Sequence, residues 1–307
     1  MIIKREIMRS NWMVNMKKLL LILFICLMLT AIIGCSNHNT VQLAASTLPV
    51  FEFTSRLCEG PDLRVGRLVT ESVSCLHDYS LQVSQMRMIE EADSVIISGA
   101  GLEDFLSDIL ADRDVIDASE NISLICPPHN DEHEHDHSDH HHETDPHFWL
   151  SPNHAKSMTE SICTELCQRY PHYTSIFKEN LVTLQKDFDN LQEYGMTQLS
   201  ELTTRELVTF HDGFSFFAES FDLTILESIE EESGSEASAA QIIHLVDLVE
   251  KNALPAIFVE TNGSDACAGI IHNETDVEIY MLDMAMAGNS YFDAMYHNID
   301  TVKEALG

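Results

Sequence analysis

The chain has 307 residues, 45% of them hydrophobic, and its 50 acidic residues outnumber its 17 basic residues to give a formal net charge of −33. A surface this acidic repels nucleic acid and anionic lipid and attracts cations, which excludes nucleic-acid-binding classes of protein. A chain of this length is long enough to form two ordinary domains.

The N-terminal region predicts an export signal. Met16-Lys17-Lys18 precede an apolar run of about fifteen residues, too short for a membrane span, that ends at Ile33-Gly34-Cys35. A small residue before a cysteine is typical of bacterial lipoprotein signals, and a plain signal peptide is the alternative. We predict a signal peptide with a lipobox at 1–35, lipidation of Cys35 and anchoring on the extracytoplasmic face of the cell membrane. The sequence leaves open whether Met1 or Met16 is the start.

Short apolar runs then alternate with amphipathic segments. Strands are predicted at 43–50, 63–69 and 93–99, and helices at 50–58, 80–92 and 101–112. In the last of these helices, four residues are expected to share one apolar face: Leu102, Phe105, Leu106 and Ile109. This alternation predicts a parallel sheet covered by helices.

A histidine-rich tract interrupts the pattern, which resumes at Ser151-Pro152. Serine before proline is typical of a helix start, and this helix is predicted to run to about Arg169. The next segment, 171–201, predicts one long helix of about 40 Å. Beyond it, strands are predicted at 205–210, 255–260 and 277–283, helices at 212–221, 239–252 and 291–306, and loops at Glu227–Glu232 and 234–238.

The predicted fold class is α/β, with two parallel-sheet lobes joined by a single long rigid helix. The corresponding boundaries are an N-terminal lobe at 36–170 that includes a His-rich loop at 129–145, a linker helix at 171–201 and a C-terminal lobe at 202–307. Cys163 and Cys167 are expected to be buried apolar residues, because i, i+4 spacing on one helix is a poor geometry for a disulfide. Cys267 is expected to be unpaired, and the pairing of Cys58, Cys75 and Cys126 stays open.

Four residues with metal-binding side chains fall next to strand or helix ends. Ligands of open α/β sheets bind beyond the carboxyl ends of the strands. His211 follows the strand 205–210, Asp283 ends the strand 277–283, His77 follows the strand 63–69 and its loop, and His147 precedes a helix start. Three imidazoles and one carboxylate would suit a closed zinc site, although each residue alone could be a capping or turn residue.

The tract at 129–142 contains the zinc-peptidase pattern H-E-x-x-H at His133–His137. That chemistry requires both histidines on one face of a packed helix, and this tract has no apolar residues that would hold such a helix against a core. We therefore reject a peptidase site. The composition predicts a disordered collector of weakly bound zinc, whose auxiliary ligands are His129, His133, His135, His137, His140, His141 and His142. His154, His172, His244, His272 and His297 are interpreted as surface or helix-face residues.

Four ordered segments resemble a known family, the metal-binding solute-binding lipoproteins of zinc and manganese ABC importers. They are SVSCLHDYSLQVSQMRMIEEADSVIISGAGLEDFL, DPHFWLSPNHAK, VTFHDGFSFFAESFDL and YMLDMAMAGNSYFDAMYHNIDTVKEAL. The resemblance spans residues 40–307 and implies a metal between two α/β lobes, with His77, His147, His211 and Asp283 as ligands. Histidine at the third ligand position, together with the His-rich insert, implies the zinc branch.

The chain also departs from the family pattern. Cys75-Leu76 stand where a proline-like residue commonly precedes the first ligand, and 261–269 replaces a Pro-Gln-Phe-Ser type of loop. Cys267 has no nearby partner, so the C-lobe disulfide of some members is not expected here.

The predicted function is high-affinity capture of Zn²⁺ outside the cytoplasm and its delivery to an ABC permease, by a monomer that is not an enzyme. The alternatives are a manganese- or iron-binding protein of the same fold and an adhesin-type surface lipoprotein. A zinc hydrolase would require a general base beside the metal, and the sequence offers no credible one.

Overall fold

The computed structural model describes residues 40–71, 76, 79–120, 122–125, 144–228, 238–261 and 266–307. Both sheets lie within Val41–Gly307, which forms one compact unit. The predicted signal peptide, Cys35, Cys75, His77, Cys126 and the tract at 129–142 lie outside the described residues. In the described part of the chain, no helix is long and apolar enough to cross a membrane.

The N-terminal lobe is built on a parallel sheet of four short strands in the order β2-β1-β3-β4. Leu43 of β1 pairs with Val65 of β2 on one side and with Ser94 of β3 on the other. The elements of this lobe are β1 (Leu43–Ala45), α2 (Leu48–Leu57), β2 (Val65–Arg67), α3 (Val83–Glu91), β3 (Ser94–Ile97), η1 (Asp104–Leu106), α4 (Ser107–Leu110) and β4 (Val115–Asp117).

Two predictions in this lobe were wrong in detail. The strand predicted at 43–50 ends at Ala45, because Thr47 becomes the N-cap of α2 and Pro49 lies in its first turn. The helix predicted at 101–112 is a 3₁₀ turn followed by the short α4, and the tighter winding changes which side chains share a face. Ile109 is therefore 39% exposed, while Leu110 lies inside.

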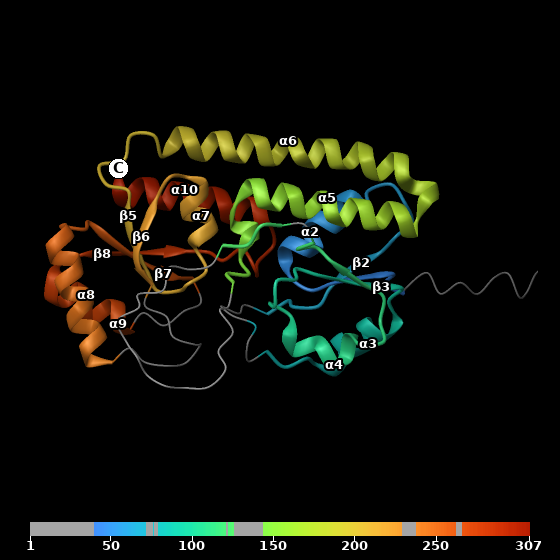
Figure 1. Cartoon of the computed structure of the whole chain (residues 1–307), viewed down its shortest axis with the longest axis horizontal. Coiled ribbons are helices and arrows are strands. Elements are labelled where there is room, and N and C mark those ends of the chain that lie inside the picture. The colour runs from blue at the N-terminus through green and yellow to red at the C-terminus, as the bar shows by residue number, and fades with distance from the viewer. Residues whose placement is uncertain are drawn as a thin grey trace, which may run out of the picture. The chain divides into compact units, whose positions relative to one another are not determined.

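The predicted helix that begins after Ser151 is confirmed as α5 (Pro152–Arg169), with the Ser151 hydroxyl accepting a hydrogen bond from the amide of His154 at 3.4 Å. A 3₁₀ turn, η3 (Pro171–Tyr173), then leads into α6 (Thr174–Gln198). α6 has 25 residues and packs along α5, α2 and α10 (Figure 1). Its buried stripe is Phe177, Leu184, Phe188 and Leu191.

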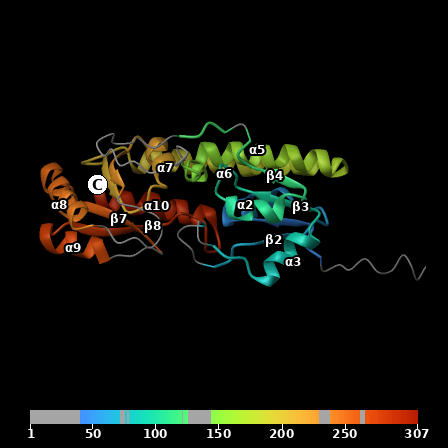
Figure 2. The ribbon, with the colours of Figure 1, turned by 60° about the horizontal axis from the view of Figure 1, so that its bottom comes forward.

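The C-terminal lobe has a second parallel sheet, ordered β6-β5-β7-β8. α8 and α9 pack on one side of this sheet through the apolar cluster around Val208, Leu245 and Ile271 (Figure 2). The elements are β5 (Glu206–Thr209), α7 (Ser215–Ser220), β6 (Thr224–Ser228), α8 (Ala239–Asn252), β7 (Ala256–Glu260), α9 (Ala266–Thr275), β8 (Glu278–Leu282) and α10 (Tyr291–Leu306).

Two strands and one α-helix of the described chain were absent from the sequence prediction. They are β4, β6 and α9. Glu227, interpreted as part of a loop, belongs to β6, and residues 266–269 of the segment interpreted as a replacement loop belong to α9. Both changes extend the C-terminal lobe without altering its class.

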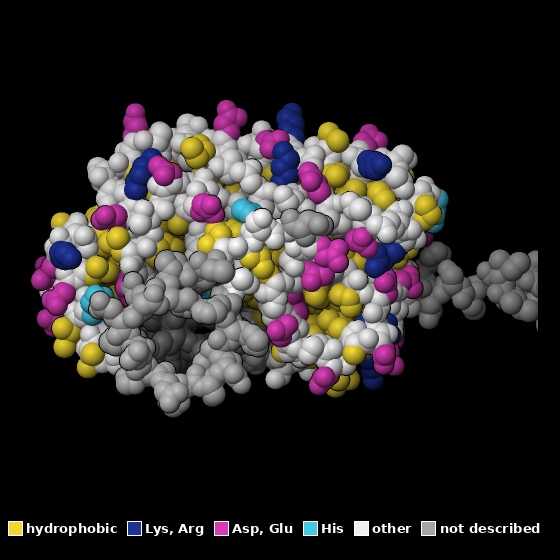
Figure 3. Space-filling view, viewed as in Figure 1, with side chains coloured by type: hydrophobic (Ala, Val, Ile, Leu, Met, Phe, Trp, Pro, Cys, Tyr) yellow, Lys and Arg dark blue, Asp and Glu magenta, His cyan; other side chains and the backbone are white. Residues whose placement is uncertain are grey.

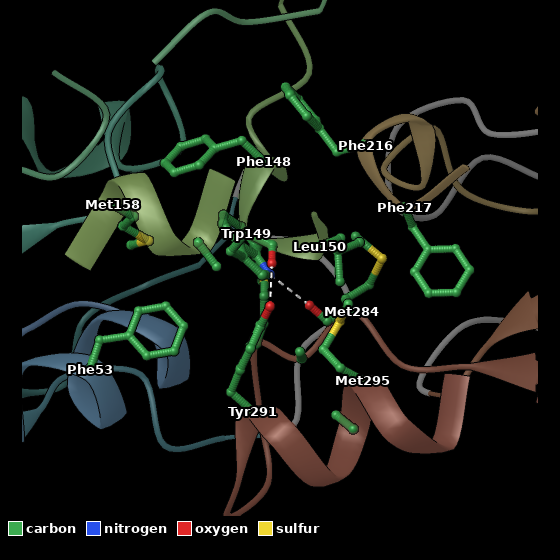
Figure 4. Packing of buried hydrophobic residues seen from close by; sticks show 14 of the residues in the cluster. Phe53, Phe148, Trp149, Leu150, Met158, Phe216, Phe217, Met284, Tyr291 and Met295 are labelled. Atoms are coloured by element: carbon green, nitrogen blue, oxygen red, sulfur yellow. Dashed lines mark hydrogen bonds between the residues drawn. The ribbon is translucent and has the colours of Figure 1, made fainter. Parts of the chain in front are cut away.

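The predicted fold class, two parallel-sheet α/β lobes with a long helix, is confirmed, and the exact lobe boundaries stay predictions. The lobes share one hydrophobic core, in which Phe53 and Trp149 pack with Met284 and Tyr291 (Figure 4). Phe53 makes edge-to-face contacts with Phe188 at 5.2 Å and with Tyr291 at 4.9 Å between ring centroids. Burial of so many aromatic rings couples the two sheets energetically.

The described cysteines form no disulfide: Cys58, Cys163, Cys167 and Cys267 are free. Cys163 is buried as predicted, whereas Cys167 is only partly buried. Burial raises the pKa of Cys58 and of Cys163 to about 12, and each nearby thiol adds to the effect. Thiols of this kind are unreactive at neutral pH.

Candidate metal centre

His147 and His211 come from different lobes and meet in the interior. His147 is the N-cap of η2 (Phe148–Leu150), just before α5, and His211 is two residues beyond the end of β5. Their ring centroids lie 5.1 Å apart with an interplanar angle of 78°. Both residues are buried, with 5% and 6% of their surface exposed. The structure thus brings together two of the four ligands predicted from the sequence.

Each of the two imidazoles faces a buried carboxylate through Nδ1. His147 Nδ1 lies 2.9 Å from Asp145 Oδ1, and His211 Nδ1 lies 2.9 Å from Glu260 Oε1. A proton held on Nδ1 and donated to the carboxylate leaves the Nε2 lone pair of each ring available to a metal. The backbone amide of His147 also donates to Asp145 Oδ1, at 2.8 Å, which fixes this carboxylate.

The Nε2 atom of His147 fits a metal ligand. It is buried and makes no hydrogen bond to any residue that the structure describes. Buried polar atoms are nearly always hydrogen-bonded, so an unsatisfied imidazole nitrogen requires an explanation, and a bound cation supplies one. The donor chemistry, imidazole nitrogen supported by carboxylate, suits zinc and other divalent transition metals.

Gly213 makes the close approach of the two imidazoles possible. A Cβ atom at this position would lie 2.7 Å from His211 Cδ2 and 2.8 Å from His147 Nδ1, and it would also collide with the Met284 side chain. Any larger residue would displace at least one ring. Position 213 therefore requires a glycine, because there is no space for a Cβ atom beside the imidazole pair.

Asp283 follows β8 and is partly buried. Its Oδ1 accepts a hydrogen bond from the amide of Ala285 at 2.7 Å. The Asn298 side chain bonds both backbone groups of Asp283, at 2.8 Å and 2.7 Å. In the described ranges, no three His, Cys, Asp or Glu side chains form a group that could hold a metal, and His77 lies outside those ranges. The complete ligand set therefore remains a prediction.

Acidic groups surround the imidazole pair. Desolvation raises the pKa of Asp212, and the negative charge of Asp145 raises it further, while a hydrogen bond from Ser228 and the two imidazoles lower it. Acidic side chains are also spread widely over the outer face shown in Figure 3. Both features favour a cation over an anion at this position.

The other described histidines have ordinary contacts, in line with their interpretation from the sequence. His154 bonds the Ser151 hydroxyl at 2.9 Å and packs on Phe216, and burial lowers its pKa while Glu219 opposes the shift. His272 lies 2.7 Å from the Val277 carbonyl. His244 lies 3.7 Å from Glu227 at the surface.

Asp145 and Glu260 were not identified from the sequence as members of the site. Glu260 is the last residue of β7, so the same strand-end reasoning that selected His211 applies to it. Asp145 lies two residues before His147, within hydrogen-bond reach. Neither residue has a sequence signal that distinguishes a partner of an imidazole from a surface carboxylate.

The fold and the buried imidazole pair define a class, the two-lobed α/β metal-binding proteins. A family model described as zinc-uptake complex component A, periplasmic, matches residues 43–305, and the chain belongs to this family. The resemblance noted from the four sequence segments is thereby confirmed. The family consists of substrate-binding transport proteins and not of enzymes.

Relatives of known name bind different metals. The zinc-binding lipoprotein AdcA of Streptococcus pneumoniae strain R6 is 27% identical over 309 residues, which cover 94% of this chain and 61% of AdcA, so the chain spans about six-tenths of that relative. The manganese-binding lipoprotein MntA of Halalkalibacterium halodurans is 26% identical over 242 residues, which cover 75% of this chain and 77% of MntA. A crystal structure of ZnuA has the same fold, with a TM-score of 0.74 at 23% identity, covering 88% of this chain and all of ZnuA.

Proposed function

We propose that the chain is a zinc-binding protein that captures Zn²⁺ outside the cytoplasm and delivers it to an ABC permease. The observation that carries this proposal is the buried pair His147 and His211, each with a carboxylate on Nδ1, and the unsatisfied Nε2 of His147. Carboxylate–histidine pairs of this type are typical of protein zinc sites. The protein would act as a monomer, anchored to the membrane through lipid on Cys35.

The proposed ligands are His77, His147, His211 and Asp283. Three nitrogen donors and one oxygen donor would complete a tetrahedral zinc site with no position left for water, which favours tight capture over catalysis.

The roles of the residues around the four proposed ligands follow from their contacts. Asp145 and Glu260 hold a proton on each Nδ1 and orient the rings, and Gly213 leaves room for the rings. Burial of the pair keeps water away from the ion.

The rival cargo is manganese, since MntA is named as a manganese-binding relative. A site rich in imidazole favours zinc over manganese according to the Irving–Williams order. Metal-free protein is incubated with equimolar Zn²⁺ and Mn²⁺, separated from free metal and analysed for bound metal. We expect about one tightly bound zinc per chain and almost no manganese. A protein that retains manganese in preference to zinc would overturn the zinc assignment.

A further inference from the structure

Trp149 connects the two lobes beside the imidazole pair. It follows His147 by two residues, is fully buried, and packs edge-to-face on the His147 ring at 5.3 Å between centroids. Its indole Nε1 donates a hydrogen bond to the Met284 carbonyl at 2.9 Å. Its own carbonyl accepts one from the Tyr291 hydroxyl at 2.7 Å (Figure 4). One residue of the N-terminal lobe thus bonds both ends of the segment 284–291 in the C-terminal lobe.

This segment, which connects β8 to α10, starts directly after Asp283. Three further hydrogen bonds join it to the N-terminal lobe. Arg67 donates to the Gly288 carbonyl at 2.9 Å, the amide of Leu48 donates to the Met286 carbonyl at 3.4 Å, and the amide of Tyr291 donates to Glu52 Oε2 at 2.5 Å. The segment therefore belongs to the C-terminal lobe by chain connection and to the N-terminal lobe by hydrogen bonding.

The segment also has a backbone conformation that requires such support. Ala285 is buried and has a φ of +54°, in the left-handed region that costs an alanine free energy. Its amide donates a hydrogen bond to Asp283 Oδ1, so the Asp283 carboxylate is held by the same segment. Strained residues of this kind persist where the surrounding contacts determine the conformation.

We propose that Trp149 is a positioning residue, which fixes the spacing between His147 and Asp283 through its hydrogen bonds to Met284 and Tyr291. This inference rests on the proposed function, in which both His147 and Asp283 bind the metal. If the indole is lost, the buried Met284 carbonyl loses its hydrogen-bond donor. Only water could replace that donor, and the lobes would have to separate slightly to admit it. The ligands of a bound zinc ion are then held less firmly at the correct spacing, so the lobes separate more readily and zinc dissociates faster.

The test measures zinc dissociation from the full chain, by transfer to a colorimetric chelator in a stopped-flow instrument. Trp149→Phe removes the indole donor but keeps an aromatic ring, and Tyr291→Phe removes only the hydroxyl. We expect each variant to release zinc about tenfold faster or more, with little change in the rate of zinc binding. Unchanged dissociation rates in both variants would overturn the proposal.

Tyr194→Phe is the matched control. Tyr194 in α6 donates to Asp300 of α10 at 2.6 Å, so this variant also loses a tyrosine hydroxyl bond between helices but touches no residue of the metal site. We expect its zinc dissociation rate to match that of the unaltered protein at comparable thermal stability. If Tyr194→Phe accelerates release as much as Tyr291→Phe, the effect is general destabilisation and the positioning role is wrong.

Two further measurements separate this inference from the proposed function. His147→Ala should abolish tight zinc binding; if it does and both aromatic variants release zinc normally, only the positioning role fails. If His147→Ala binds zinc normally, the proposed function itself fails.

In a Trp12→Phe background, Trp149 is the only tryptophan of the chain, and its emission should shift when zinc binds. Emission that is unchanged by saturating zinc would contradict the coupling of the indole to the site.

Discussion

At the scale of single residues, the candidate metal centre depends on which nitrogen of each imidazole carries the proton. A neutral imidazole is protonated on one nitrogen and can bind a metal only through the other. Asp145 and Glu260 make this choice for His147 and His211, because each accepts a hydrogen bond from Nδ1. The two carboxylates are buried, so in the proposed zinc site they would strengthen the imidazoles as ligands through charge as well as orientation.

Glu260→Gln tests this role. The amide oxygen of glutamine can still accept from His211 Nδ1, but the negative charge is lost, so we expect zinc affinity to fall by about tenfold to hundredfold. Zinc affinity is measured by competition with a chelator of known affinity. Glu193→Gln, on the exposed side of α6, makes the same chemical change away from the site and should leave affinity unaltered. An affinity of Glu260→Gln equal to that of the control would contradict the role given to this carboxylate.

At the scale of secondary-structure elements, Arg169 joins the end of α5 to the start of β4. Its guanidinium donates two hydrogen bonds to Asp114, at 2.7 Å and 2.9 Å, and forms a further ion pair with Glu165. The hydrogen bond from Arg169 lowers the pKa of Asp114, and a hydrogen bond from Ser94 lowers it further. The contact places the C-terminal end of α5 on the edge of the first sheet.

Asp114→Asn should therefore lower stability in a pH-dependent way. Because the folded-state pKa of Asp114 is below its ordinary value of 3.8, the ionised form contributes stability above that value and loses it as pH falls through the folded-state pKa. Asp114 is about half exposed, so we expect about 0.2–1 kcal/mol at pH 7. Urea unfolding of both proteins at pH 7 and pH 3 measures the difference. A difference that stays constant between these pH values would contradict the role of the charge.

Elements with strong local signals could be predicted, and elements that depend on tertiary pairing could not. α5 and α8 have an N-cap serine and a long amphipathic pattern, and both begin at the predicted residue. β4 has only three residues, and β6 mixes exposed and half-buried positions at the edge of its sheet, so neither has a clear apolar run. Short edge strands are defined by their neighbours more than by their own residues.

The residues of the candidate site also differ in how well the sequence predicts them. His211 could be predicted because it lies just beyond a strand in an α/β pattern, and His147 because it precedes a helix start. The strand-end position of Glu260 could be predicted in the same way, but the roles of Glu260 and Asp145 could not, since these roles depend on a contact with an imidazole. For Glu260 that contact joins β7 to the end of β5. The shared core around Trp149 likewise requires knowledge of how the two lobes pack.

At the scale of the whole molecule, two properties serve a cation-binding protein. The formal net charge of −33 raises the local concentration of cations around the chain. The histidine tract at 129–142 adds seven further imidazoles, next in sequence to Asp145 and His147. We propose that this tract binds zinc weakly and that the buried site binds it tightly.

Deletion of residues 129–142 separates the two kinds of site. Isothermal titration of intact and deleted protein with Zn²⁺ should show one tight site in both, and additional weak sites only in the intact chain. Imidazoles that do not belong to a closed coordination site bind metals less tightly than such a site does. If the deletion removes the tight site, a necessary ligand lies inside the tract. If the deletion removes no site at all, the tract has no role in zinc binding.

The central claim is that His147 and His211 are ligands of one tight zinc site. His147→Ala and His211→Ala each remove one ligand, and a competition titration against a chelator measures zinc affinity directly. We expect each variant to lose at least about a hundredfold in affinity while its circular dichroism spectrum stays that of the unaltered protein. Zinc affinity that is unchanged in either variant would contradict the assignment.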